Sequence, residues 1–291
     1  MHLHEALAAY EGQAVANGRS QHSVLQSRRH VRALSNWLTS SGQSADVAEL
    51  DHSDIANFMG SDQALLRPDG KRKKPVSLNA LRSSLRTFFA YTNAAGMTPT
   101  NPARLLRRAV CAPPPPRALS AAEQRKLLSV LNKAASPPET RDRLCFLLQL
   151  RAGLRLGSVV ALDAIDIDFD EGRLGVRLKG GREDQVFVPR EVLDELRRFL
   201  AGRDEGPVFI GPSGRRLTTR HLQRRFARLR ERAGLPANLS SHGLRHTFAT
   251  QLLEKTGDLE LVRKALSHKS ISSTTIYARC GDARLREAIG V

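Results

Sequence analysis

Apolar side chains recur every three or four positions through two segments of the first third of the chain, residues 31–38 and 78–88. Such spacing places apolar residues on one face of a helix. It predicts helices over residues of about 3–16, 21–40, 51–59, 76–95 and 101–109. Gly96 follows the fourth of these and predicts its end. Trp37 lies beside the apolar stripe of the second helix, which favours a core position over a platform for stacking bases.

The apolar pattern changes period in the middle of the chain. From Ile165 to about residue 190, apolar residues alternate with aspartates and then with Gly, Arg and Lys, and Gly180-Gly181 interrupts the alternation. Alternation predicts strands and a glycine pair predicts a turn, so we expect a small antiparallel sheet. Residues 141–153 have the pattern of a buried helix, and helical patterning resumes near residue 190. The predicted fold class is mainly α with a small antiparallel β-sheet.

Four consecutive prolines occupy positions 113–116. Prolines cannot continue a helix and form a stiff, extended spacer. We therefore expect a linker over residues 111–117, between a helical domain at 1–110 and a second domain at 118–291 that contains the sheet. Ser120 predicts the N-cap of the first helix of that second domain.

Charge narrows the possible partners. The 291 residues include 46 Lys+Arg against 29 Asp+Glu, a formal net charge of +17. Such an excess favours a polyanion, nucleic acid before an anionic membrane surface. No basic amphipathic helix with aromatic anchors supports the membrane alternative. Three distant cysteines, Cys111, Cys145 and Cys280, form no CxxC pair, and no signal peptide or spanning segment is evident. We expect a cytoplasmic protein.

A basic loop between two predicted helices is a candidate DNA contact. It combines a Pro-Asp-Gly turn with a run of cations, which can bind phosphates. A solvated surface loop is an equally good interpretation of this segment alone. The candidate DNA-binding residues are Arg67, Lys71, Arg72, Lys73 and Lys74, and Arg182 in the predicted hairpin.

Five short stretches together indicate phosphoryl transfer. They contain the candidate residues Arg155, Lys179, His242 with Arg245, His268 and Tyr277. Two guanidinium forks can clamp a phosphate whose charge grows in the transition state, without a metal. A tyrosine hydroxyl is a nucleophile whose phosphate ester is readily reversed. His242 and Arg245 are three residues apart, so they share one face of a helix.

Each residue alone has an ordinary structural interpretation, because single arginines, lysines and tyrosines are usually surface or core residues. His242 and His246 are four apart, which can indicate zinc. Position 243 is Gly rather than the Glu of an HExxH motif, and no third ligand is evident. We expect no metal, and we expect His246 to pack against the protein.

With these residues, the chain resembles the tyrosine recombinase (phage integrase) family, most closely short Xer-type recombinases and transposon or phage integrases. The resemblance covers residues 118–280, and the N-terminal region resembles the family's core-binding domain. It rests on HxxR at His242–Arg245, then Ser267-His268, then Tyr277. Ser158 stands where the family usually has an acidic residue that braces the first arginine, and Ser267 where it usually has Gly.

The resemblance implies a role for each matching residue. Tyr277 would be the nucleophile, and the phosphate-binding arginines would be Arg155 and Arg245. His242 would be the general base, Lys179 the general acid, and His268 a hydrogen-bond donor to the phosphate. Pro189 lies further beyond Lys179 than in typical short members, so the hairpin is expected to be longer. Arg182 is a second cation in this hairpin and an alternative to Lys179 as the general acid.

The resemblance also implies a reaction and an assembly. A 3′-phosphotyrosyl link would form, and two strand exchanges would pass through a Holliday junction, without ATP, metal or other cofactor. A homo-tetramer, or a hetero-tetramer with a related recombinase, would join two specific double-stranded DNA sites, with each protomer a two-domain C-shaped clamp. Two alternatives stay open: a type IB DNA topoisomerase, and a non-catalytic DNA-binding protein with the same fold.

Overall fold

A computed structural model describes residues 1–111, 117–177, 181, 183–267 and 274–278. The chain divides into two compact units, Met1–Pro113 and Pro114–Val291, each with its own core. Five of the seven residues of the predicted linker, 112–116, lie outside the described part of the chain. Across that described part, every helix is too short or too polar to cross a bilayer.

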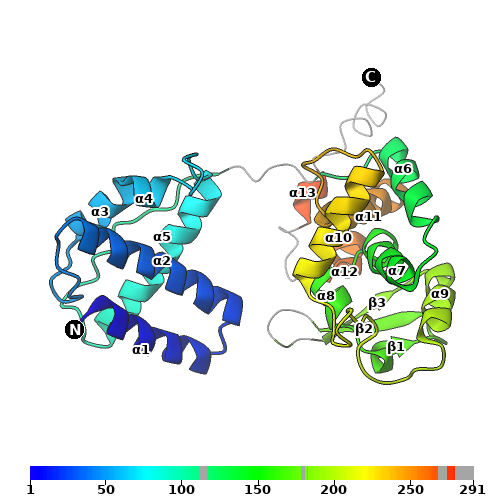
Figure 1. Cartoon of the computed structure of the whole chain (residues 1–291), viewed down its shortest axis with the longest axis horizontal. Helices are drawn as coiled ribbons and strands as arrows, with labels where there is room; N and C mark the ends of the chain where they lie inside the picture. The colour runs from blue at the N-terminus through cyan, green and yellow to red at the C-terminus, as the bar shows by residue number, and fades with distance from the viewer. Residues whose placement is uncertain (112–116, 178–180, 182, 268–273, 279–291) are drawn as a thin grey trace. The chain divides into compact units, whose positions relative to one another are not determined.

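The first unit is helical (Figure 1). Its described helices are α1 (Leu3–Ala16), α2 (Gln21–Ser40), α3 (His52–Gly60), α4 (Asp62–Leu65) and α5 (Pro75–Ala94). Helix α2 packs against both α1 and α5, and the predicted stripe residues Leu34 and Phe88 are fully buried. Trp37 packs against this core with its ring 5.7 Å from that of Phe58, which confirms its predicted core position.

The second unit is mainly helical, with a small sheet at one edge (Figure 1). The strands β1 (Ile167–Asp168), β2 (Arg173–Arg177) and β3 (Glu183–Phe187) are antiparallel in the order β1-β2-β3. Its described helices are α6 (Ala121–Leu131), α7 (Pro137–Ala152), α8 (Leu156–Ala161), α9 (Arg190–Leu200), α10 (Thr219–Arg232), α11 (His242–Thr256), α12 (Leu259–Ala265) and α13 (Thr275–Ala278). This architecture confirms the predicted fold class. Ser120 caps α6, and Glu123 completes the capping box.

Helix α7 is the central element of the second unit. It contacts α9 and α11, and residues on all its sides are buried, including Leu144, Phe146 and Leu148. It begins at Pro137, four residues before the predicted start, because Ser136 and Glu139 form a capping box there. The packing of α11 on α7 fixes the helix that carries His242 and Arg245.

Two predictions of secondary structure were wrong in detail, and one short helix was missed. Residues 101–109 form turns rather than a helix, and the Asn79 side chain bonds both the N–H and the carbonyl of Ala109. The first predicted strand shrinks to two residues, because Ala164–Asp166 form a 3-10 turn that leaves Ile165 78% exposed. Helix α4 was not predicted.

Candidate catalytic site

Arg245 holds two distant segments of the second unit together. It lies in the first turn of α11 and is 4% exposed. Its Nη1 donates to the carbonyl of Gly153 and its Nη2 to the carbonyl of Leu266, the latter at 2.6 Å. Burial, followed by the charge of Arg155, lowers its pKa to about 9, so the guanidinium is charged at neutral pH. Two of its five N–H groups serve the fold, which leaves others for an anion.

Gly153 makes the turn that leads from α7 to Arg155. Its φ of 65° is left-handed, and a Cβ there would lie 2.4 Å from Cδ1 of Phe248. Arg155 follows as the extended N-cap of α8 and is half-buried. A short turn therefore links the carbonyl that braces Arg245 to the second arginine of the site.

Replacing Gly153 with alanine should lower the free energy of unfolding by about 2–4 kcal/mol. Left-handed backbone costs an alanine about 1–2 kcal/mol, and overpacking against Phe248 adds a similar amount. Denaturant unfolding measures the change. Gly157→Ala is the matched control, because a Cβ at this α8 position meets nothing within 4 Å and should be neutral or stabilising. Equal stability of the two variants would contradict the role of this turn.

Tyr277 lies in the same electrostatic environment as the two arginines. It is 2% exposed and packs against Ala249, Val262 and Leu266. Burial raises the pKa of its phenol, and the positive charges of Arg245 and Arg155 oppose that rise. The Tyr277 phenol in turn opposes the lowering of both arginine pKa values by burial. The charges of Arg155, Arg245 and Tyr277 thus influence one another's pKa values.

Two histidines of α11 lie beside this group. The rings of His242 and His246 meet edge to face, with centroids 4.5 Å apart. The hydroxyl of Tyr277 contacts Nδ1 of His246 at 2.7 Å, whereas His242 is exposed. Desolvation and the charges of Arg245 and Arg155 lower the pKa of His242. The imidazole next to the phenol is therefore His246, which the sequence had indicated only as a packing residue.

Three candidate residues, Lys179, Arg182 and His268, lie outside the described part of the chain. Lys179 and Arg182 fall between β2 and β3 in the sequence, where the neighbouring Gly181 has a left-handed φ of 76°. Ser267, the residue before His268, also has a left-handed φ, of 52°. This backbone conformation accounts for the glycine that is usual at the position, because L-residues adopt it at a cost.

The basic loop of the first unit is exposed and tightly turned. Arg67 bonds to the backbone of Lys71 across a turn with Gly70 at a φ of 75°, and Arg67 also pairs with Asp69. Lys71, Arg72 and Lys74 are exposed. Lys73 differs from them, because its ammonium bonds to the carbonyls of Gln63 and Ala64 at the end of α4. Any DNA contact by Lys73 would compete with these bonds.

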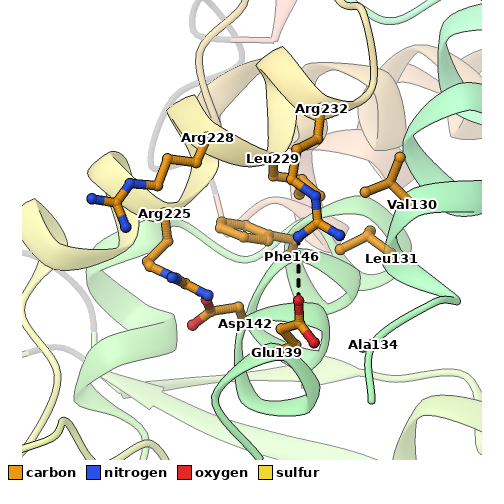
Figure 2. Close-up of a pocket in the computed structure, with 10 residues that line it drawn as sticks. All are labelled: Val130, Leu131, Ala134, Glu139, Asp142, Phe146, Arg225, Arg228, Leu229 and Arg232. Atoms are coloured by element: carbon orange, nitrogen blue, oxygen red, sulfur yellow. Dashed lines mark hydrogen bonds and ion pairs between the residues drawn. The ribbon is translucent and has the colours of Figure 1, made fainter. Parts of the chain in front are cut away.

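One hollow of the second unit lies at a structural cluster, and another reaches a catalytic candidate. Figure 2 shows a pocket between α6, α7 and α10, where Arg232 pairs with Glu139 above apolar residues that include Phe146. The catalytic candidates do not line it. A second depression reaches His242 and is lined by Leu156, Gln223, Phe226, Ala227, Arg230, Ala237, Asn238, Leu239, Ser240 and Ser241. Among the described residues, no three His, Cys, Asp or Glu side chains cluster as metal ligands.

The fold, with two arginines and a buried phenol in its second unit, suits a protein that transfers phosphoryl groups. Comparison with known proteins identifies the family. Residues 117–284 match the phage integrase family, and residues 10–96 match the phage integrase N-terminal SAM-like domain. The chain belongs to the phage integrase family, which confirms the resemblance seen in the sequence.

Individual relatives are similar over most of the chain. Tyrosine recombinase XerC of Xanthomonas campestris pv. campestris (strain B100) is 33% identical over 261 residues, covering 89% of this chain and 78% of the relative. Tyrosine recombinase XerC of Chromobacterium violaceum is 32% identical over 280 residues, covering 94% and 90%.

Solved structures share the fold at lower identity. A lambda integrase dimer bound to a COC' core site has a TM-score of 0.74 at 23% identity, covering 95% of each chain. The XerH site-specific recombinase in a post-cleavage complex with difH has a TM-score of 0.72 at 20% identity, covering 95% of this chain and 81% of that one.

Proposed function

We propose that this chain is a tyrosine-type site-specific DNA recombinase that cuts DNA through a bond between Tyr277 and a scissile phosphate. The observation that carries the proposal is a buried phenol that packs against Leu266, whose carbonyl Arg245 binds, and whose pKa the charges of Arg245 and Arg155 lower against the effect of burial. A phosphodiester placed there would meet the charge that phosphoryl transfer requires. Family membership and XerC relatives support the same activity.

The first step exchanges one phosphate ester for another. The phenolic oxygen bonds to phosphorus, the bond to the 5′ oxygen breaks, and a 3′-phosphotyrosyl link remains. Arg155 and Arg245 neutralise charge on the nonbridging oxygens. His242 takes the phenolic proton in the roles carried over from the family, Lys179 protonates the departing 5′ oxygen, and His268 donates a hydrogen bond to the phosphate.

The second step restores the DNA. A 5′-hydroxyl from a partner duplex attacks the phosphotyrosyl link and releases the phenol, so the energy of the broken bond is kept and no ATP is needed. Two such exchanges pass through a Holliday junction. A lambda integrase tetramer bound to a Holliday junction shares this fold at a TM-score of 0.71. We propose that four copies of this chain, or copies of it and of a related recombinase, assemble on two DNA sites.

Basic residues of the first unit, at 67–74 and on its helices, would contact the backbone and the major groove of the DNA. The exposed cations of its basic loop, Arg67, Lys71, Arg72 and Lys74, suit contacts with the phosphate backbone. We propose that the protein acts in the cytoplasm, with chromosomal or plasmid DNA as its substrate.

Trapping of a covalent adduct tests the proposal. Genomic fragments of the source organism are incubated with the protein, and DNA retained after denaturation is sequenced to find the site. In a duplex with that site and a nick next to the cut, cleavage releases a short fragment that carries the 5′-hydroxyl. The fragment diffuses away and cannot reverse the reaction, so the phosphotyrosyl link accumulates. Peptide mapping should place the link on Tyr277. Binding without any adduct would favour a non-catalytic DNA-binding protein.

A relaxation assay separates recombinase from topoisomerase. We expect supercoiled plasmid without the site to stay supercoiled, and plasmid with two sites to yield recombinant products. Relaxation of the plasmid without a site, at a rate equal to that of site-directed cleavage, would instead assign the arginine-phenol chemistry to a type IB topoisomerase.

A further inference from the structure

The hydrogen bond between His246 and Tyr277 joins the proposed nucleophile to a residue without an assigned role. Nδ1 of His246 lies 2.7 Å from the phenolic oxygen, and the two ring centroids are 5.6 Å apart. Tyr277 is 2% exposed, so bulk water has little access to its ring. The partner of the hydroxyl in this structure is a protein side chain.

Burial and the charges around this pair set the protonation state of each side chain. Desolvation, together with His242 and Arg245, lowers the pKa of His246 to about 4, so the imidazole is neutral at physiological pH. Burial raises the pKa of Tyr277, so the phenol keeps its proton. The neutral imidazole accepts from the phenol in the tautomer that carries its proton on Nε2, and this is the tautomer that the proposal assigns to His246.

This hydrogen bond sets the direction of the lone pairs on the phenolic oxygen of Tyr277. Rotation about the C–O bond of a free phenol leaves the hydroxyl proton in either of two in-plane directions. With the O–H of Tyr277 directed at Nδ1 of His246 before the reaction, a lone pair of the oxygen is free for attack, and the proton leaves for His242 only as the bond to phosphorus forms. The edge-to-face contact with His242 restrains the imidazole ring itself. Both the acceptor and Arg245, its neighbour in sequence, are carried by α11.

We propose that His246 is a positioning residue that directs the hydroxyl proton of Tyr277 away from the phosphate and thereby orients the phenolic oxygen for attack. The inference rests on the proposed function and adds a residue to it. Its role is that of a neutral hydrogen-bond acceptor. A general base would instead have to remove the phenolic proton and become an imidazolium. This requirement can be tested separately from hydrogen-bond acceptance.

Two substitutions distinguish these requirements. His246→Asn places an amide oxygen near the position of Nδ1, so it can accept the hydrogen bond but cannot take up a proton. His246→Leu has a similar size and offers no acceptor. The rate of adduct formation on the nicked duplex is measured in a single turnover, with DNA affinity measured in parallel. We expect Leu to slow adduct formation about 10- to 100-fold, and Asn to restore it to within about fivefold of the unsubstituted protein, at unchanged affinity.

The control is His221→Asn, a histidine of α10 whose ring contacts Arg141. It should form the adduct at the rate of the unsubstituted protein. Full activity of folded His246→Leu would overturn the proposal. Equally slow Leu and Asn variants would also overturn it, because they would indicate proton transfer to His246. So would a loss of adduct formation that only follows a loss of DNA affinity. An absence of adduct from the unsubstituted protein would instead be a failure of the proposed function.

A stability cycle tests the same contact without activity. His246→Leu should destabilise the chain with Tyr277, because it leaves a buried hydroxyl unpaired, and should do so less in the Tyr277→Phe background, which has no hydroxyl. Equal destabilisation in both backgrounds would show no coupling between His246 and the hydroxyl of Tyr277, which would count against the bond on which the proposal rests.

Discussion

Tyr277→Phe should form no covalent adduct with the nicked duplex, while its DNA affinity stays that of the unsubstituted protein. The substitution removes one oxygen, the atom that would bond to phosphorus, and leaves the ring in its pocket with Ala249, Val262 and Leu266. Loss of a covalent nucleophile costs at least about 1,000-fold in rate. Denaturing gels of trapped complexes give the measurement, and a shift assay gives the affinity.

The matched control for this substitution is Tyr91→Phe. Tyr91 is a half-buried residue of α5 in the first unit, and its ring lies 5.6 Å from that of Tyr10 in the same unit. It should form the adduct normally. Tyr277→Phe should also lose about 1 kcal/mol of stability, because Nδ1 of His246 then lacks its donor. A Tyr277→Phe variant that still forms the adduct at full rate would move the nucleophile elsewhere.

The helices that the sequence predicted best are those whose limits are set locally. The limits of α1 and α2 agree with the predicted 3–16 and 21–40, because His2 and Ser20 cap their first turns and their apolar faces are regular. The predicted helix at 101–109 failed for a non-local reason. The side chain of Asn79, 30 residues away, takes both hydrogen-bonding groups of Ala109. No local pattern reports such a partner.

In the candidate site, too, contacts between residues distant in sequence could not be predicted. The residue types and their order were sufficient to predict that Arg155, Arg245 and Tyr277 would lie together. What braces Arg245 was not visible, because the carbonyls of Gly153 and Leu266 lie 92 and 21 residues away, and every residue has a carbonyl. The sequence signal for His246 was its spacing of four from His242, which places both rings on one face of α11. That spacing did not show which ring the phenol would reach.

The bracing of Arg245 by carbonyls explains why positive charge alone should not replace it. In Arg245→Lys, a single ammonium replaces a planar fork, so it cannot bond both carbonyls and a phosphate in the same geometry. We expect adduct formation to fall by at least about 100-fold, and stability to fall by about 1–3 kcal/mol because a buried carbonyl loses its donor. Arg232→Lys is the control, since that arginine forms an exposed ion pair with Glu139 (Figure 2) and should tolerate the change.

The chemistry of the scissile phosphate separates the two roles of Arg245. A methylphosphonate at the cut replaces one charged nonbridging oxygen with a methyl group, which removes the charge that the guanidinium would neutralise. If Arg245 acts on that charge, the defect of Arg245→Lys should shrink on the neutral substrate, while its loss of stability, measured without DNA, stays the same. A defect of equal size on both substrates would mean that Arg245 acts on the reaction only by holding Gly153 and Leu266 in place, and that Arg155 bears the phosphate alone.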